Sequence, residues 1–187
     1  SSFSADYTRT TIAPSTDAVF KNQASHTAKG VLQWKKMTML RLDQGSPSKE
    51  LLVTDGQTVW WHIPEEKQVF LYRDVDLAGQ LGPLLNFLSG LEALTDSYDV
   101  LPVLDEEQRE DQIGLVLEAK QGEDKATGKM IIYCDSKFSL TGFRLSSLTG
   151  EKTDFYLSNI KINPRFKDEF FVFKVPKGTT VVEETEG

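Results

Sequence analysis

The sequence predicts a mostly β protein in which one antiparallel sheet is interrupted by a leucine-rich helical insert. Short runs of apolar and β-branched residues recur at spacings of roughly 8–14 residues, separated by glycine, proline and polar turn residues. Helical spacing of apolar residues is confined to one stretch, residues 76–95. Strands that follow one another without intervening helices pair antiparallel, because a parallel pair needs a long crossover connection. The pattern therefore favours a meander with one insert that can cover a face of the sheet.

The strand predictions follow the apolar runs along the chain. The first half holds runs 30–34, 37–43, 51–54, 58–63 and 68–72. The second half holds runs 113–120, 129–135, 140–146, 153–162 and 169–175, and Val181 and Val182 add a short last strand. Between two of these runs, Asp55-Gly56 is a strong hairpin signal, because glycine adopts positive φ at little steric cost.

The predicted helical insert breaks in its middle. Pro83 fits the first turn of a second helix after Gly82, and the glycines of the stretch make it short and breakable rather than one rigid rod. Its leucines recur at helical spacing, at Leu77, Leu81, Leu84, Leu85, Leu88 and Leu91. Such a stripe is typical of ordinary helix-on-sheet core, and it equally suits a lid over an apolar ligand.

Length and composition narrow the class of protein. A chain of 187 residues favours a single domain over 1–187, and 39% hydrophobic with 26% charged residues is typical of a globular protein. The net charge of −7 disfavours nucleic acid as a partner, because phosphate backbones repel an acidic chain. Apolar runs stay well short of about 18 residues, so we expect no stable membrane insertion.

Candidate chemistry is sparse, and we expect no enzyme. Cys134 is the single cysteine and lies in a strand-like run, which favours a small buried hydrophobe over a nucleophile. Neither His26 nor His62 stands in a recognisable motif with it. The charged run 105–111 is most simply solvated loop, without the spacing of a calcium loop. No metal site and no cofactor are expected.

One block of the sequence carries a family resemblance. Residues 51–64 read LLVTDGQTVWWHIP, and Lys67-Gln68-Val69 follow. This block resembles the outer-membrane lipoprotein carrier family, LolA, in its apolar strand, its Asp-Gly turn, its aromatic pair and its proline. Weaker similarity spans nearly the whole chain, in residues 2–8, 32–36, 40–42, 154–157 and 170–181.

The resemblance implies a fold and a function. The fold is a curved antiparallel sheet, an unclosed barrel, with a helical lid over its concave face. The function is that of a periplasmic chaperone that binds the acyl chains of lipoproteins in an apolar cavity and carries them from the inner to the outer membrane. The implied partners are an inner-membrane ABC transporter complex and an outer-membrane lipoprotein receptor. Two alternatives use the same scaffold: the outer-membrane receptor itself, and a lipid-sensing regulator.

The resemblance also implies site residues. Leu40, Leu42 and Trp60 are the candidates for the cavity wall. Trp60 and Trp61 point to opposite faces of their strand, so at most one lines the cavity, and sequence does not say which face is concave. The candidates for the lid, for which the family match outweighs plain core packing, are Leu84, Leu85, Phe87, Leu88 and Leu91.

The lid of the family is latched by an arginine that precedes a proline. Here Lys36-Met37 stands at that place, and lysine keeps the charge but lacks the planar fork of arginine. Arg41 matches another arginine common in the family, so Lys36 and Arg41 are the latch candidates. The family also has an amphipathic helix before its first strand, whereas this sequence begins almost on that strand. We therefore expect part of the cavity mouth to be exposed.

Overall fold

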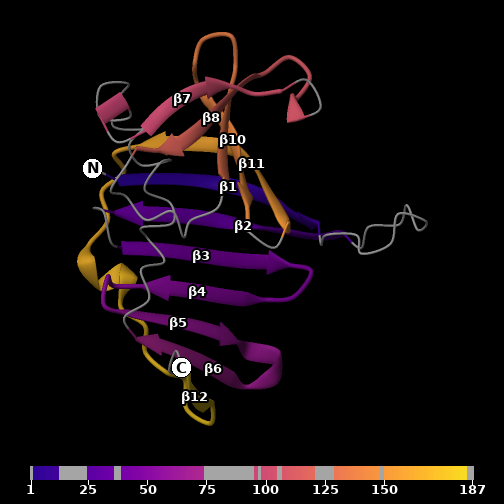
Figure 1. Cartoon of the computed structure of the whole chain (residues 1–187). Helices are drawn as coiled ribbons and strands as arrows, with labels where there is room; N and C mark the ends of the chain where they lie inside the picture. Colours follow the sequence, from indigo (N-terminus) through magenta and orange to yellow (C-terminus); the bar gives the residue numbers. More distant parts are fainter. Residues whose placement is uncertain are drawn as a thin grey trace, which may run out of the picture. The chain divides into compact units, whose positions relative to one another are not determined.

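The structure is mostly β, as predicted. The computed structural model describes residues 2–12, 25–35, 39–73, 95–96, 98–104, 107–120, 129–147 and 150–184 (Figure 1). The strands within these ranges are β1 (Ser2–Ile12), β2 (Ser25–Lys35), β3 (Met39–Ser46), β4 (Glu50–Thr54), β5 (Thr58–Ile63), β6 (Gln68–Arg73), β7 (Tyr98–Pro102), β8 (Ile113–Ala119), β9 (Lys129–Cys134), β10 (Leu140–Ser146), β11 (Lys152–Ile162) and β12 (Thr180–Glu184). Two short 3-10 helices are η1 (Pro64–Glu66) and η4 (Asp168–Phe171).

The strands form a single unclosed sheet. Their order is β12-β6-β5-β4-β3-β2-β1-β11-β10-β9-β8-β7, so β12 and β7 are two separate edges. The pairs from β2 to β6 and from β7 to β11 are antiparallel, whereas at one edge β12 runs parallel to β6. The prediction of an entirely antiparallel sheet is therefore wrong for this strand.

The contacts of the chain group into two compact units, which are described separately. Unit 1 comprises Ser1–Tyr7, Ala28–Gly82 and Ser158–Gly187, and unit 2 comprises Thr8–Thr27 and Pro83–Leu157. The predicted lid segment, residues 76–95, lies almost wholly outside the described residues. The helical lid therefore stays a prediction.

The turn between β4 and β5 forms as its sequence predicts. Gly56 has a φ of 100°, which a side chain would strain. The Asp55 carboxylate accepts hydrogen bonds from the backbone N–H groups of Gln57 and Thr58, at 2.9 and 3.0 Å. A local hydrogen bond between side chain and backbone fixes a turn without distant contacts, so this hairpin can be predicted from sequence alone.

The register of β3 to β6 separates two faces of unit 1. Leu42 lies opposite Leu52, Leu52 opposite Trp61, and Trp61 opposite Phe70. We call this side the leucine face, made of Leu40, Leu42, Leu52, Trp61 and Phe70. The other side is made of Arg41, Val53, Trp60 and Leu71, which pair with one another in the same way. We call it the strap face, because a C-terminal segment, the strap, crosses it. Residues paired across neighbouring strands share a face of the sheet.

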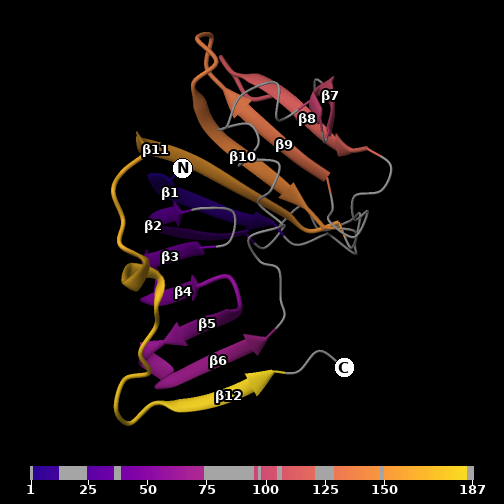
Figure 2. The ribbon, with the colours of Figure 1, turned by 90° about the vertical axis from the view of Figure 1, so that its left-hand side faces the viewer.

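A C-terminal segment crosses the strap face. Residues 163–179, here called the strap, leave β11 beside β1 and reach β12 beside β6 (Figure 2). The strap begins where the Asn163 N–H donates to the Ser2 carbonyl, and it ends where the Thr180 N–H donates to the Lys67 carbonyl. Because it is a crossover, β12 enters the sheet parallel to β6. The strand predicted at 169–175 is wrong: this stretch holds part of η4 and extended chain across the sheet.

Unit 2 contains a strand that sequence reasoning missed. β7 is a short edge strand that ends in proline and pairs with β8. Proline and charge are tolerated at an edge, where one row of backbone groups needs no partner, so β7 lacks the alternating pattern of an inner strand. Inside the unit, the rings of Phe143 and Phe155 stack with centroids 4.5 Å apart. Cys134 is fully buried, as predicted for a small hydrophobe.

Candidate functional site

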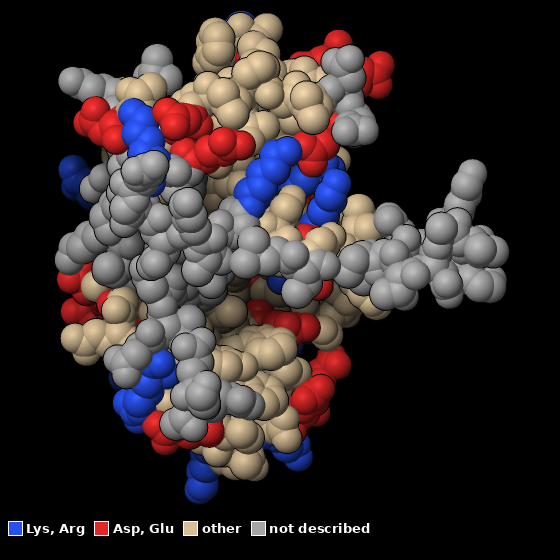
Figure 3. All heavy atoms as spheres, in the orientation of Figure 1, with Lys and Arg blue, Asp and Glu red and all other residues tan. Residues whose placement is uncertain are grey.

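The leucine face is an apolar surface that is only partly covered. Leu40 is buried, whereas Leu42, Leu52, Trp61 and Phe70 all remain partly exposed. The rings of Trp61 and Phe70 lie 5.4 Å apart between centroids. Figure 3 shows uncharged atoms over β4 to β6 with acidic groups beside them. A row of leucine and aromatic side chains of this kind can hold a hydrocarbon chain, because contact removes apolar area from water on both partners.

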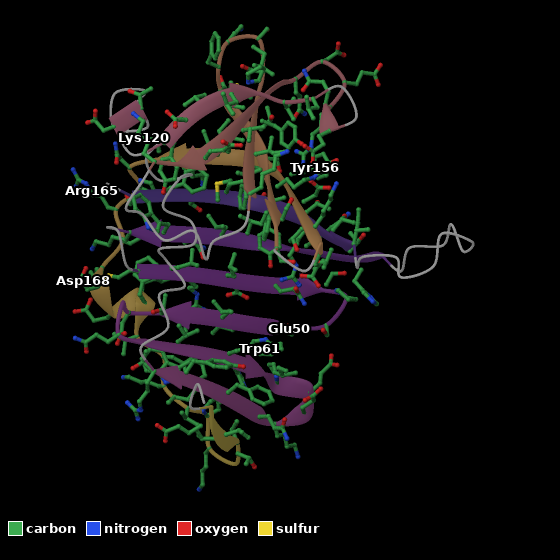
Figure 4. All side chains as sticks on the ribbon, in the orientation of Figure 1. Glu50, Trp61, Lys120, Tyr156, Arg165 and Asp168 are labelled. Carbon is green, nitrogen blue, oxygen red and sulfur yellow. The ribbon has the colours of Figure 1, made fainter. Side chains whose placement is uncertain are left out.

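The leucine face has a polar end at the turn between β3 and β4. Gln44 lies opposite Glu50 in register, and both share the face of Leu42. The Glu50 carboxylate accepts hydrogen bonds from the Gln44 amide at 3.0 Å, the Ser48 hydroxyl at 2.9 Å and the Trp61 indole at 3.0 Å. Figure 4 shows Glu50 and Trp61 side by side on neighbouring strands. The carboxylate thus orients the indole ring.

The register corrects the predicted cavity wall. Leu40 and Leu42 share one face, as predicted, but Trp60 lies on the strap face, opposite Val53. There its ring packs against Phe173 of the strap, with centroids 6.3 Å apart. Leu40, Leu42 and Trp60 therefore cannot line one side of the sheet, and Trp61 is the tryptophan that shares the face of Leu40 and Leu42. Alternation within β5 separates the two tryptophans, but only the pairing with β4 shows which one joins the leucines.

The latch candidates have different outcomes. Lys36 lies outside the described residues. Arg41 lies on the strap face, where it contacts Asp43 at 3.2 Å and the Phe170 carbonyl at 3.5 Å, with its guanidinium 4.9 Å from the Phe170 ring centroid. Arg41 therefore binds the strap, on the side opposite Leu40. The lid candidates also lie outside the described residues: Leu84, Leu85, Phe87, Leu88 and Leu91.

Sequence reasoning missed a buried arginine in the loop before β8. The Arg109 side chain is only 8% exposed and pairs with Asp154 at 2.8 Å. Its guanidinium stacks between the rings of Tyr133 and Tyr156, 3.8 and 4.0 Å from their centroids. Gly142 leaves room for it, because a Cβ there would lie 2.7 Å from Arg109 Nη1 and 2.2 Å from the Phe155 carbonyl oxygen. We call Arg109, Asp154, Tyr133 and Tyr156 the arginine clamp.

The clamp overturns the prediction of plain solvated loop for Arg109, whereas Gln108, Glu110 and Asp111 are exposed, as predicted. Burial raises the pKa of Asp154, but hydrogen bonds from Arg144 and Arg109 outweigh it and hold the pKa below its usual value. Glu107, also in the loop, pairs with Lys129, and this bond lowers the pKa of Glu107. A cluster of charges in a loop sequence gives no signal for burial, since that depends on partners supplied by β10 and β11.

Other chemistry is limited in the described part of the chain. Its His, Cys, Asp and Glu residues form no group suited to holding a metal ion. Burial raises the pKa of the Cys134 thiol, so the thiolate that a nucleophile needs is disfavoured. None of the helices in the described ranges is long and apolar enough to span a bilayer.

Fold and site together define a class of protein: an open β-sheet with a partly exposed apolar face suited to binding apolar ligands. Residues 2–174 match the family model described as outer membrane lipoprotein carrier protein LolA, and the chain belongs to that family. The resemblance seen in the sequence is thereby confirmed.

Individual relatives agree with the family match. An outer-membrane lipoprotein carrier protein from Vibrio campbellii is 27% identical over 97% of this chain and 79% of its own length. A protein of the same name from Legionella pneumophila is 30% identical over 88% of this chain and 78% of its own length. The crystal structure of an uncharacterized conserved protein from Thermus thermophilus covers 98% of this chain and 90% of its own, with a TM-score of 0.52 and 14% identity. That last likeness supports the fold alone.

Proposed function

We propose that this chain is a periplasmic chaperone that binds the acyl chains of lipoproteins on its leucine face and carries them from the inner to the outer membrane. The observation that carries the proposal is the family match over residues 2–174. Relatives named lipoprotein carriers and the partly exposed apolar row on β3 to β6 support it. The same family model spans parts of both units, which supports one functional domain over residues 1–187.

A carrier must release what it binds. Each buried CH₂ group contributes roughly 0.8 kcal/mol, so several fully buried acyl chains would exceed the usual ceiling for non-covalent affinity, near −18 to −21 kcal/mol. The site must therefore be partly open, or covered by other apolar groups when it is empty. Partial exposure of Leu42, Leu52, Trp61 and Phe70 fits this requirement, because a ligand on this face gains only part of the maximal burial.

The lid is the second part of the proposal. We infer that Leu84, Leu85, Phe87, Leu88 and Leu91 close over the bound chains, because their spacing places apolar groups along one side of a helix. Replacing Leu88 with Glu separates lid from core. If Leu88 belongs to the lid, the substitution lowers the folding stability only slightly, because the lid can move and let the carboxylate reach water, and acceptance of lipoprotein falls. If Leu88 is a core residue, the substitution lowers the folding stability by several kcal/mol. Normal melting with normal acceptance would refute the lid.

The proposed partners are an inner-membrane transporter complex that loads the carrier and an outer-membrane receptor that unloads it. Transfer between them requires no nucleotide chemistry in this chain. The receptor and the lipid-sensing regulator remain the alternative functions on this scaffold. An assay for release of a lipoprotein from inner-membrane vesicles into the soluble fraction distinguishes these functions. A carrier must release the lipoprotein, whereas a receptor or a lipid-sensing regulator need not remove cargo from that membrane.

The test compares the two faces of the sheet. Leu42 and Leu71 are both partly exposed, but Leu42 lies on the leucine face and Leu71 on the strap face. Leu42→Gln and Leu71→Gln make the same chemical change on opposite sides. We expect Leu42→Gln to reduce release of lipoprotein from inner-membrane vesicles and Leu71→Gln to leave it nearly unchanged. Equal release by both variants, each shown to be folded by thermal melting, would remove the leucine face from the proposal.

A direct observation complements the variants. Protein purified from its own periplasm should carry lipid-modified peptide, which mass spectrometry of an organic extract detects. An extract that contains only free phospholipid would contradict a lipoprotein carrier and favour a lipid-sensing role.

A further inference from the structure

The leucine face ends in a carboxylate, Glu50, that forms no ion pair with the described part of the chain. Glu50 is the first residue of β4 and shares the face of Leu52 and Trp61. Its three hydrogen-bond donors are an amide, a hydroxyl and an indole N–H, all of them neutral. No ion pair reaches Glu50 within the described residues. The donors therefore fix the position of the negative charge without cancelling it.

This arrangement contrasts with that of two carboxylates on the other side of the sheet. On the strap face, Asp43 pairs with Arg41 and Asp168 pairs with Lys35, so each of these two negative charges has a cation beside it. Glu50 lies instead on the apolar side of the hairpin. An acyl chain that lies along Leu42, Leu52 and Trp61 places its polar head either at this end or at the other end of the row.

We propose that Glu50 is a specificity-determining residue: it favours acyl ligands whose head is uncharged beside the chains and disfavours ligands that carry a phosphate there. The proposal rests on the carrier function above and on the head lying at the Glu50 end. The head of an acylated cysteine contains ester, thioether and amide groups, which bear no charge. A glycerophospholipid carries its phosphate on the glycerol that bears its chains.

Coulomb repulsion sets the size of the effect. Two like charges about 6 Å apart repel enough to weaken binding roughly 3-fold in a water-like dielectric and roughly 100-fold at the effective dielectric of a protein surface. We therefore expect a discrimination of about tenfold against phosphate. Salt weakens this repulsion, because Glu50 is only partly buried and mobile ions screen exposed charges.

The experiment uses two ligands with the same chain. Monoolein has an uncharged glycerol head, and oleoyl lysophosphatidic acid adds a phosphate to the same skeleton. Titration calorimetry of the full chain gives a Kd for each, and the ratio of the two isolates the head. We expect the unmodified protein to prefer monoolein and Glu50→Gln to lose about tenfold of that preference by gaining affinity for the phosphate ligand.

Two further variants separate charge from shape. Trp61→Phe removes the indole N–H that Glu50 accepts but keeps the carboxylate, so both ligands should weaken together and their ratio should stay. Asp43→Asn removes a carboxylate from the same hairpin on the strap face, and it should leave both Kd values unchanged. High salt should reduce the ratio in the unmodified protein, which tests the charge without any substitution.

The outcomes are distinct. If neither Glu50→Gln nor high salt changes the ratio of the two Kd values, the proposed role of Glu50 is wrong, but the carrier function is unaffected. Failure of the unmodified protein to bind either ligand counts against acyl binding itself, and the specificity falls with it. A ratio lost equally in Asp43→Asn would assign the effect to the net charge of the protein rather than to Glu50.

Discussion

Two arginines of this protein lie over aromatic rings beside a carboxylate, yet their surroundings differ. In unit 2, the Arg109 and Asp154 side chains are 8% and 7% exposed. In unit 1, the Arg41 and Asp43 side chains are 21% and 53% exposed. The same three kinds of group are thus arranged once in the protein interior and once at its surface.

The difference shows that burial, rather than the pairing itself, decides what such a contact is worth. A buried charge that loses its partner has no water to replace it, so breaking the clamp is costly. At the surface, water and salt take over, and the pair contributes little. The loop that carries Arg109 is therefore fixed on its sheet, whereas Arg41 is one of several weak contacts that hold the strap.

Replacing Asp154 with Ala should give the largest effect. It leaves the buried Arg109 and the partly buried Arg144 without their shared carboxylate, and removing one partner of a buried pair costs about 3–5 kcal/mol. The matched variant Asp43→Ala removes the exposed partner of Arg41, and we expect a cost of about 0–1 kcal/mol. Urea unfolding measures both. Equal losses in the two variants would show that burial does not decide the contribution.

Replacing Gly142 with Ala tests the space that the clamp requires. The new Cβ would lie 2.2 Å from the Phe155 carbonyl oxygen and 2.7 Å from Arg109 Nη1, so the strand or the guanidinium must shift. We expect a loss of about 1–3 kcal/mol, typical of overpacking. Gly45→Ala is the control, since a Cβ there meets nothing within 4 Å. A Gly142→Ala protein as stable as the unmodified one would mean that the clamp is loosely packed.

The clamp should also make stability depend on pH. The pKa of Asp154 is lower in the folded protein than in the unfolded chain, so its carboxylate stabilises the fold fully above the unfolded pKa, about 4. This contribution is lost as pH falls from there through the pKa of the folded state. It amounts to about 1.4 kcal/mol for each unit by which folding lowers the pKa of Asp154. Chemical unfolding between pH 7 and pH 2.5 measures it. In Asp154→Asn this part of the acid sensitivity should vanish; its persistence would assign the effect to other carboxylates.

The smallest effect should come from Arg41→Ala. The guanidinium is partly exposed and lies 4.9 Å from the Phe170 ring centroid, and contacts of this kind contribute about 0.5–1 kcal/mol at exposed sites. The ladder between β12 and β6 continues to hold the strap in place. Thermal melting should therefore shift by only a few degrees. A loss as large as that of Asp154→Ala would instead make Arg41 a principal latch of the strap.

Some features of this structure can be predicted from the local sequence alone. Alternating apolar runs predict most of the inner strands, and Asp55-Gly56 predicts its hairpin, because both signals act between residues close in the chain. The same alternation separates Trp60 from Trp61. The block around them also indicates the family, which the match over residues 2–174 confirms.

The tertiary structure decided what depends on distant partners. Pairing with β4 assigned Trp61, not Trp60, to the face of Leu40 and Leu42, because alternation fixes only relative sides and register fixes which side faces which. The crossover of the strap made β12 parallel and converted a predicted strand into η4 and extended chain. In the sequence, Arg109 looks like a solvated loop residue. In the structure, β10 and β11 place a glycine, an aspartate and a tyrosine around it.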